Sequence, residues 1–134
     1  MKMLLDTHIA LWAIADTGKL SGEMIKLLES KDNEVFYSAA SIWEVAIKHK
    51  IKPEQMPMPE EVFVDLCQKT GFSLLPIKPE HIFLIKTLVR PDDAPKHNDP
   101  FDRMLLAQAK HEKLRFVTHD SLLPYYGEDC IMSV

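Results

Sequence analysis

Short apolar segments alternate with longer segments of helical periodicity along the whole chain, and this alternation limits the folds available to it. The segments of strand length cover residues 3–5, 35–37, 72–75, 115–118 and 130–133. Helical spacing or helix-end signals occur over residues 7–15, 20–30, 38–49, 60–70, 79–88 and 100–112. Strands separated by helices need crossover connections, which make the strands parallel and place helices on both faces of the sheet. We therefore expect an α/β fold, a three-layer α/β/α sandwich with a mostly parallel five-stranded sheet.

Glycine and proline mark where these elements end. Three prolines within residues 51–59 and two within residues 90–98 predict loops. Gly71 directly follows a predicted helix, at the position where a C-terminal glycine is common. Pro79 and Pro100 stand where a helix tolerates proline, in its first turn.

Length and composition predict one folded domain over residues 1–134. Hydrophobic residues make up 46% of the chain and charged residues 27%, which are ordinary globular proportions. The formal net charge of −4 argues against a nucleic-acid partner, because phosphate binding usually leaves a basic surface. That objection is weaker if the acids gather at one place and hold divalent cations, which reverse the local charge.

Cysteine usage and hydropathy indicate the compartment. Cys67 and Cys130 form no metal or redox motif, and we expect both to be reduced and buried. The longest early apolar run, residues 9–15, is too short to cross a membrane. We expect a soluble, cytoplasmic protein.

Four acidic residues fall at equivalent places in the predicted fold. Asp6 ends the first strand, and Glu44 lies in the second turn of the helix after the second strand. Asp102 lies in the first turn of the helix before the fourth strand, and Asp120 lies two residues past that strand. Ligands of open parallel sheets bind beyond the carboxyl ends of the strands. We expect these four carboxylates to meet there.

Helix capping is the alternative role for three of the four acids. Glu44 lies three residues after Ser41, as in a capping box. Asp99 precedes a proline, as an N-cap residue often does, and Asp102 would then be the third helical residue. Asp120 can cap the short turn that follows it. Asp6 has no such alternative in the nearby sequence.

Convergence of the four acids favours a metal site. Carboxylates in one cleft repel one another, and some take up a proton unless a cation compensates them. Oxygen ligands alone suit Mg²⁺ or Mn²⁺ rather than zinc. Such a site orients a water nucleophile and stabilises the leaving oxygen in phosphodiester cleavage. The sequence therefore predicts a metal-dependent nuclease whose catalytic residues are Asp6, Glu44, Asp102 and Asp120.

Four short motifs resemble the PIN-domain family, and more narrowly the VapC-type toxins of bacterial toxin–antitoxin pairs. They are MLLDTH at residues 3–8, SAASIWE at 38–44, HNDPFDR at 97–103 and THD at 118–120. Each motif is weak alone, but the four occur in the family's order and span nearly the whole chain. His8 departs from the asparagine of many members and matches the Asp-Thr-His branch of the family.

The resemblance implies a single PIN-like domain with Mg²⁺- or Mn²⁺-dependent endoribonuclease activity that inhibits translation or growth. It also implies homodimerisation and neutralisation by a cognate antitoxin. The family's acidic quartet matches Asp6, Glu44, Asp102 and Asp120. Asp99 belongs to the same local motif and is either a further metal ligand or a helix cap. Thr118 matches the hydroxyl residue that would orient the last acid.

Several other residues keep two interpretations. Arg103 either contacts phosphate or pairs with a neighbouring acid. His97 and His119 flank the acids and could contact RNA phosphate or shuttle a proton, but we expect both to be surface histidines. The basic run at residues 48–52 predicts a solvated helix end or a contact to the RNA backbone. Trp12 belongs to an amphipathic helix, as does Trp43, and both are expected in the core or at an interface.

Other function classes fit less well. Phosphatases of the haloacid dehalogenase type need a second aspartate two residues after the first, where this chain has His8. No glycine-rich loop for a Rossmann or P-loop site is present, because the four glycines are scattered. The remaining alternative is a non-catalytic RNA- or protein-binding regulatory module of the same fold, in which the acids only cap helices. The RNA target and the cut site are not encoded in any pattern that we identify.

Overall fold

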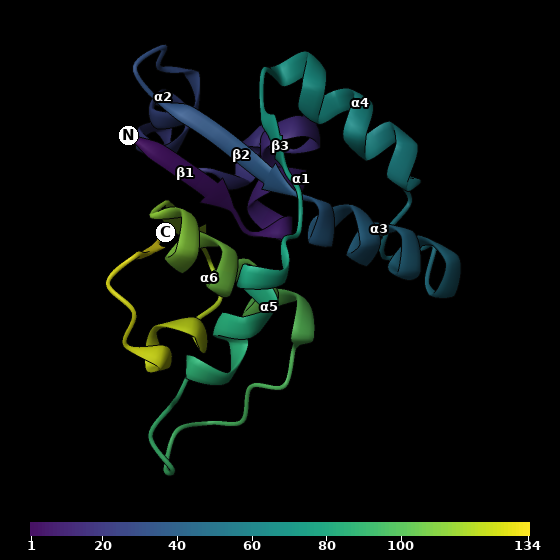
Figure 1. The fold of residues 1–134 in the computed structure, drawn as a ribbon. Coiled ribbons are helices and arrows are strands. Elements are labelled where there is room, and N and C mark those ends of the chain that lie inside the picture. Colours follow the sequence, from purple (N-terminus) through teal and green to yellow (C-terminus); the bar gives the residue numbers. More distant parts are fainter.

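A five-stranded sheet lies at the centre of the computed structural model, which describes residues 1–134 (Figure 1). Its strands are β1 (Lys2–Leu5), β2 (Glu34–Ser38), β3 (Ser73–Leu75), β4 (Arg115–Thr118) and β5 (Ile131–Ser133). They lie in the order β3-β2-β1-β4-β5, and every neighbouring pair is parallel. The expected α/β sandwich is confirmed, and its sheet is wholly parallel rather than mostly so.

Six α-helices connect the strands. They are α1 (Thr7–Ala15), α2 (Gly22–Glu29), α3 (Ala39–Ile51), α4 (Glu60–Thr70), α5 (Pro79–Leu84) and α6 (Pro100–Glu112). Three short 3-10 helices, η1 (Thr17–Lys19), η2 (Ile85–Thr87) and η3 (Leu123–Tyr126), complete the fold. The helix expected over residues 79–88 ends at Leu84 and tightens into η2. The Thr87 hydroxyl donates there to the Leu84 carbonyl at 2.6 Å.

Apolar side chains fill both faces of the sheet, which produces the three layers. Along β1, Met3 and Leu5 belong to one buried cluster and Leu4 to the other, as expected from the alternation of side chains along a strand. The first cluster packs against α1 and α4, and the second against α6. All three side chains are fully buried, so β1 is the central element of the core.

One polar side chain in the second cluster ties α6 to the sheet. Gln108 is fully buried, and its Oε1 accepts a hydrogen bond from the Ser38 hydroxyl at 2.5 Å. Its Nε2 donates to the Pro76 carbonyl at 3.3 Å. These bonds hold α6 against the carboxyl ends of β2 and β3, the edge at which the predicted acids lie.

Two remaining expectations concern cysteines and membranes. Both cysteines carry free thiols, and Cys67 is fully buried whereas Cys130 is half-buried. Burial raises the pKa of the Cys67 thiol to about 12.

None of the helices combines the length and apolar character that a membrane span requires.

Two α-helices end in left-handed backbone. Gly71 follows α4 with φ of 92°, and a Cβ placed on it would meet no atom within 4 Å. Lys113 follows α6 with φ of 58° and is the one non-glycine residue with positive φ. Since a side chain is strained in this conformation, Gly71 is well suited to its position and Lys113 is not.

Opposite stability changes are therefore expected from two substitutions. Lys113→Gly should raise the free energy of unfolding by about 0.5–1 kcal/mol, because relief of strain exceeds the added entropy of the unfolded chain. Gly71→Ala should lower it by about 1 kcal/mol for the converse reason. Urea denaturation measures both, and Lys113→Ala, which keeps a Cβ at the strained position, is the matched control. Equal stability of Lys113→Gly and Lys113→Ala would contradict the explanation.

Candidate active site

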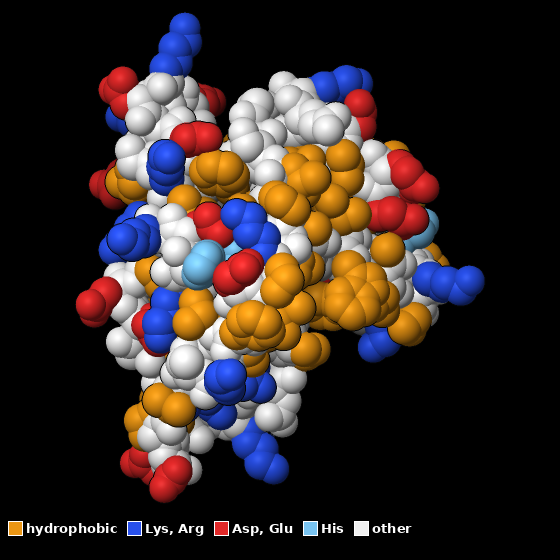
Figure 2. All heavy atoms as spheres, in the orientation of Figure 1, with side chains coloured by type: hydrophobic (Ala, Val, Ile, Leu, Met, Phe, Trp, Pro, Cys, Tyr) orange, Lys and Arg blue, Asp and Glu red, His pale blue; other side chains and the backbone are white.

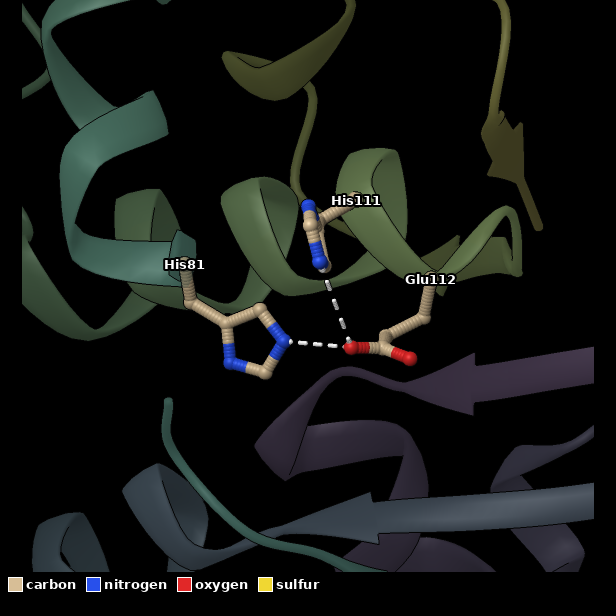
Figure 3. A group of neighbouring side chains, drawn as sticks. All are labelled: His81, His111 and Glu112. Atoms are coloured by element: carbon tan, nitrogen blue, oxygen red, sulfur yellow. Dashed lines mark hydrogen bonds and ion pairs between the residues drawn. The ribbon is translucent and has the colours of Figure 1, made fainter. Parts of the chain in front are cut away.

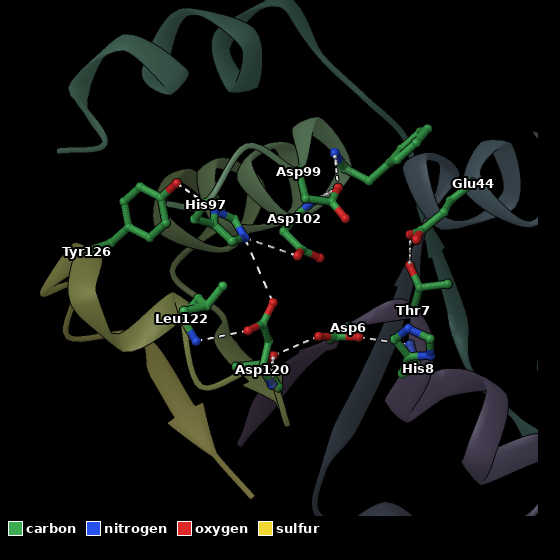
Figure 4. Close-up of polar contacts among 12 residues, drawn as sticks. Asp6, Thr7, His8, Glu44, His97, Asp99, Asp102, Asp120, Leu122 and Tyr126 are labelled. Carbon is green, nitrogen blue, oxygen red and sulfur yellow. Dashed lines mark hydrogen bonds and ion pairs between the residues drawn. The ribbon is translucent and has the colours of Figure 1, made fainter. Parts of the chain in front are cut away.

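A cleft of about 370 Å³ lies at the carboxyl edge of the sheet, where the acids were expected. Its lining includes every acid predicted from the sequence: Asp6, Glu44, Asp99, Asp102 and Asp120. Thr7, His8, Trp12 and His119 complete the lining. Figure 4 shows these acids converging from the end of β1, from α3, from α6 and from the loop after β4.

Asp6 is fixed by bonds to two different segments. It is 4% exposed, and its Oδ2 accepts a hydrogen bond from the Thr118 hydroxyl at 2.6 Å. Its Oδ1 accepts from the backbone N–H of His8 at 2.8 Å, so Asp6 is also the N-cap of α1. The sequence did not suggest a capping role for this residue. Burial, partly offset by these bonds, raises the pKa of the Asp6 carboxyl.

Thr118 supports a different acid from the one predicted. The resemblance implied that its hydroxyl would orient Asp120, but the hydroxyl donates to Asp6 instead. It accepts from the backbone N–H of Asp120 at 3.0 Å, so it contacts the backbone of the last acid and not its carboxylate. Thr118 is fully buried and links the ends of the neighbouring strands β1 and β4.

Glu44 is not part of a capping box, which corrects that interpretation. Ser38 caps α3 by accepting from a backbone N–H at 2.9 Å, and Glu44 lies in the second turn. Its Oε1 accepts from the Thr7 hydroxyl at 2.7 Å, and its Oε2 pairs with the Lys48 ammonium at 2.6 Å. Burial lowers the pKa of Lys48, but the hydrogen bond and charge of Glu44 outweigh it and raise that pKa. Lys48 thus neutralises one acid at the rim of the cleft.

Asp99 and Asp102 begin α6 and have separate roles. The Oδ1 atom of Asp99 accepts from the backbone N–H groups of Phe101 and Asp102, at 2.9 and 3.2 Å, which confirms the predicted cap. The Asp102 side chain is 13% exposed. Burial, followed by the negative charges of Asp99 and Asp6, raises the pKa of Asp102 to about 8.

Asp120 and His97 close the cleft on the side of η3. The Oδ1 atom of Asp120 accepts from the backbone N–H of Leu122 at 2.8 Å, so this acid does cap the turn that follows it. His97 was expected at the surface, but its side chain is 3% exposed, which corrects that expectation. Its Nε2 lies 3.2 Å from Asp102 Oδ2 and 3.8 Å from Asp120 Oδ2. Its Nδ1 lies 2.8 Å from the Tyr126 hydroxyl, a partner 29 residues away that no local pattern reveals.

The charge of the cleft fits a divalent cation. No lysine or arginine lies within ion-pair distance of Asp6, Asp99, Asp102 or Asp120. Partly buried carboxylates that lack a counter-charge repel one another, which the raised pKa of Asp102 expresses. Their oxygens are the ligands that Mg²⁺ and Mn²⁺ prefer. The residues present therefore fit such an ion.

Arg103 was predicted either to contact phosphate or to pair with a neighbouring acid. It forms no ion pair, and its buried Nε has no hydrogen-bond partner. His119 is exposed, as expected. Trp12 is half-buried and lines the cleft. Trp43 is 61% exposed and its ring packs edge to face with that of Phe101, at 5.2 Å between centroids, so it is not a core residue.

A second cluster of metal-binding side chains lies on α5 and α6, away from the cleft (Figure 3). His81 Nε2 lies 2.7 Å from Glu112 Oε2, and His111 Nε2 lies 4.0 Å from the same oxygen. However, the backbone N–H of Lys78 donates to His81 Nδ1 at 3.0 Å. A backbone N–H can only donate, so His81 carries its proton on Nε2 and has no lone pair there for a metal. This cluster caps α5 and joins it to α6.

Comparison with known proteins agrees with the fold and the motifs. The chain resembles a solved structure described as VapBC2 from Rickettsia felis bound to a DNA fragment from their promoter. The TM-score is 0.68 at 16% sequence identity, over 100% of this chain and 98% of that chain. No curated protein sequence matches the chain. The family model for the PIN domain matches residues 3–128. The chain therefore belongs to the PIN-domain family.

Proposed function

We propose that the protein is a metal-dependent endoribonuclease and the toxin of a type II toxin–antitoxin pair. One observation carries this proposal. Four carboxylates in one cleft have no lysine or arginine partner: Asp6, Asp99, Asp102 and Asp120. PIN domains are generally nucleases, and this cleft is at the place where ligands of parallel sheets bind. The resemblance of the motifs to VapC-type toxins supplies the narrower assignment.

The acids that line the cleft would hold the ion. Asp6, Asp102 and Asp120 each lack a lysine or arginine partner and form its centre, with Glu44 and Asp99 at its sides. When bound, Mg²⁺ or Mn²⁺ supplies Lewis-acid activation to the displacement at a phosphodiester. The net charge of −4 then ceases to oppose RNA binding, because part of it is compensated inside the cleft.

The protein's own residues pre-organise this site. Thr118 and the N-terminal backbone of α1 together fix both oxygens of Asp6, so this carboxylate needs little reorganisation. Lys48 stands at the rim with its side chain 43% exposed, where it can meet an RNA phosphate. Arg103 follows Asp102 in the chain, forms no ion pair with an acid, and is a second candidate for phosphate contact.

Two surfaces fit the proposed protein partners. A cleft of about 300 Å³ between α1, α2 and the start of β3 is lined by Leu20, Ile25, Leu28 and Phe72, among others, and suits an apolar helix of a cognate antitoxin. Figure 2 shows apolar side chains gathered on the face where β3, α3 and α5 lie in Figure 1. Ile82 and Phe83 are 52% and 61% exposed there. We assign that face to a second copy of the chain.

The first test is RNA cleavage. The purified protein should degrade RNA with Mg²⁺ or Mn²⁺ and lose activity in EDTA. Asp6→Asn should slow cleavage by about 100-fold or more, since it removes a central ligand of the ion. Induced expression of the wild type, but not of Asp6→Asn, should arrest the growth of a bacterial host. Asp65→Asn, an acid on α4 whose side chain is 57% exposed, is the control.

Cleavage that persists in EDTA and in Asp6→Asn would contradict the mechanism. Metal binding without any RNA cleavage, unchanged by Asp6→Asn, would favour the non-catalytic regulatory module instead. These two results separate the enzyme from its alternative without knowledge of the natural RNA target.

The second test follows from the raised pKa of Asp102. This carboxyl has a pKa of about 8 in the metal-free folded protein and 3.8 in the unfolded chain, so the folded state binds the extra proton. Stability should therefore fall as pH rises from 6.5 to 8.5 in EDTA, and Asp102→Asn should weaken this fall. Urea midpoints at the two pH values measure it. Saturating Mg²⁺ should restore stability at the higher pH in the wild type only. If the urea midpoints of the wild type and of Asp102→Asn fall equally between pH 6.5 and 8.5, the role given to the Asp102 carboxyl is contradicted.

The third test asks whether two copies of the chain associate through the apolar face that includes α5. Light scattering after gel filtration should find a dimer for the wild type and a monomer for Phe83→Glu, because a buried charge without a partner opposes association. Lys86→Glu, an exposed change on η2, should remain dimeric. A wild-type monomer at all concentrations would remove the assignment of this face.

A further inference from the structure

The buried imidazole of His97 lies beside two of the cleft's carboxylates, and the proposed function gives it no role. We propose that His97 joins Asp102 and Asp120 in a mixed nitrogen–oxygen site for a divalent transition-metal ion, which takes Mn²⁺ in preference to Mg²⁺. This inference rests on the proposed function for its premise that the cleft holds a metal. It adds a nitrogen ligand to the site. That ligand gives a preference for Mn²⁺ over Mg²⁺, which carboxylates alone would not give.

The three side chains are spaced as neighbouring ligands of one ion. His97 Nε2 lies 3.2 Å from Asp102 Oδ2 and 3.8 Å from Asp120 Oδ2. One ligand atom from each residue falls within 4.8 Å of the others. Adjacent ligands of an octahedral ion, each at about 2.1 Å from it, lie about 3 Å apart. Small side-chain movements are therefore enough to bring the three atoms around one ion.

The other ring nitrogen permits this role. His97 Nδ1 lies 2.8 Å from the Tyr126 hydroxyl, and a hydroxyl can accept as well as donate. When it accepts the proton of Nδ1, the lone pair of Nε2 faces the two carboxylates, as seen in Figure 4. Histidine ligands in metal sites commonly donate their second N–H in this way. His81 lacks that freedom, because its Nδ1 faces the backbone N–H of Lys78.

Packing holds the imidazole in place before any ion binds. The His97 side chain is 3% exposed, and its ring meets that of Tyr126 edge to face, at 5.5 Å between centroids and 85° between planes. Tyr126 is itself buried at the end of η3. A ligand held in this way loses little conformational freedom on binding, which favours affinity.

The nitrogen donor sets the metal preference. Imidazole binds borderline transition-metal ions better than it binds Mg²⁺, for which carboxylate and water oxygens are preferred. Asp6 and Glu44, which also line the cleft, offer only oxygens. The His97 side is thus the part of the cleft that distinguishes Mn²⁺ from Mg²⁺.

Pulsed electron paramagnetic resonance of the Mn²⁺-loaded full chain tests the inference directly. A nitrogen bound to Mn²⁺ gives nuclear modulation from ¹⁴N, and ¹⁵N-labelling of histidine should change that modulation accordingly. We expect the coupling in the wild type and its loss in His97→Gln. His119→Gln is the matched control, because His119 also lines the cleft but is exposed and has no carboxylate within ion-pair distance. That control should keep the coupling.

Calorimetric titration with Mn²⁺ alone and with Mg²⁺ alone supplies the second readout. His97→Gln should weaken Mn²⁺ binding about tenfold or more and change Mg²⁺ binding by less than about threefold. Tyr126→Phe, which removes the acceptor of the Nδ1 proton, should keep the nitrogen coupling and weaken Mn²⁺ about tenfold. The second variant remains informative if His97→Gln does not fold.

Three results would overturn the inference. Mn²⁺ that binds without nitrogen coupling to the wild type would leave the proposed nuclease intact and remove His97 as a ligand. Coupling that survives in His97→Gln and disappears in His119→Gln would move the nitrogen to the other histidine. Failure of both ions to bind would remove the inference and the proposed function together.

Discussion

Parallel pairing of β1 with β4 is the constraint from which the rest of the site follows. Because Leu5 pairs with Val117, the residues just beyond them, Asp6 and Thr118, come into hydrogen-bond contact at 2.6 Å. The helices α1 and α3 begin at that same edge, directly after β1 and β2, and α6 begins there before it returns the chain to β4. Acids from distant parts of the sequence are thus brought together by the topology, despite the repulsion between their charges.

Capping and metal binding are compatible roles at this edge. Asp99 and Asp120 each use Oδ1 to accept a backbone N–H, and neither residue's Oδ2 is bonded to a backbone group. Helix N-termini concentrate unpaired N–H groups and positive potential, so they position carboxylates and partly offset their repulsion. The sequence presents the two roles as alternatives because each has the same residue pattern. In three dimensions one carboxylate can serve both roles, with one oxygen for each.

Local signals predicted the elements well where a cap or a strand end is encoded next to the element itself. Helices α1 and α6 and strand β4 have the bounds that were predicted from helical spacing, from Pro100 and from the short apolar run. The sequence also located all the acids of the cleft. It placed His97 at the surface, because the contact with Tyr126 depends on how two distant segments fold back on each other. The family resemblance assigned Thr118 to Asp120, because the pairing of β1 with β4 that brings Thr118 to Asp6 is a contact between distant segments. Residue spacing carries no information about such contacts.

This arrangement costs more than a set of helix caps requires. A cap needs one oxygen at an exposed helix end, and an asparagine or serine serves nearly as well as an aspartate. This cleft instead keeps four carboxylates without a lysine or arginine partner, buries Asp6 to 4% exposure and raises the pKa of Asp102 to about 8. A purely structural role would not require that repulsion, and a neutral side chain at Asp102 would avoid it. A bound cation removes the repulsion and makes use of it, because the same charges that destabilise the metal-free cleft bind the ion.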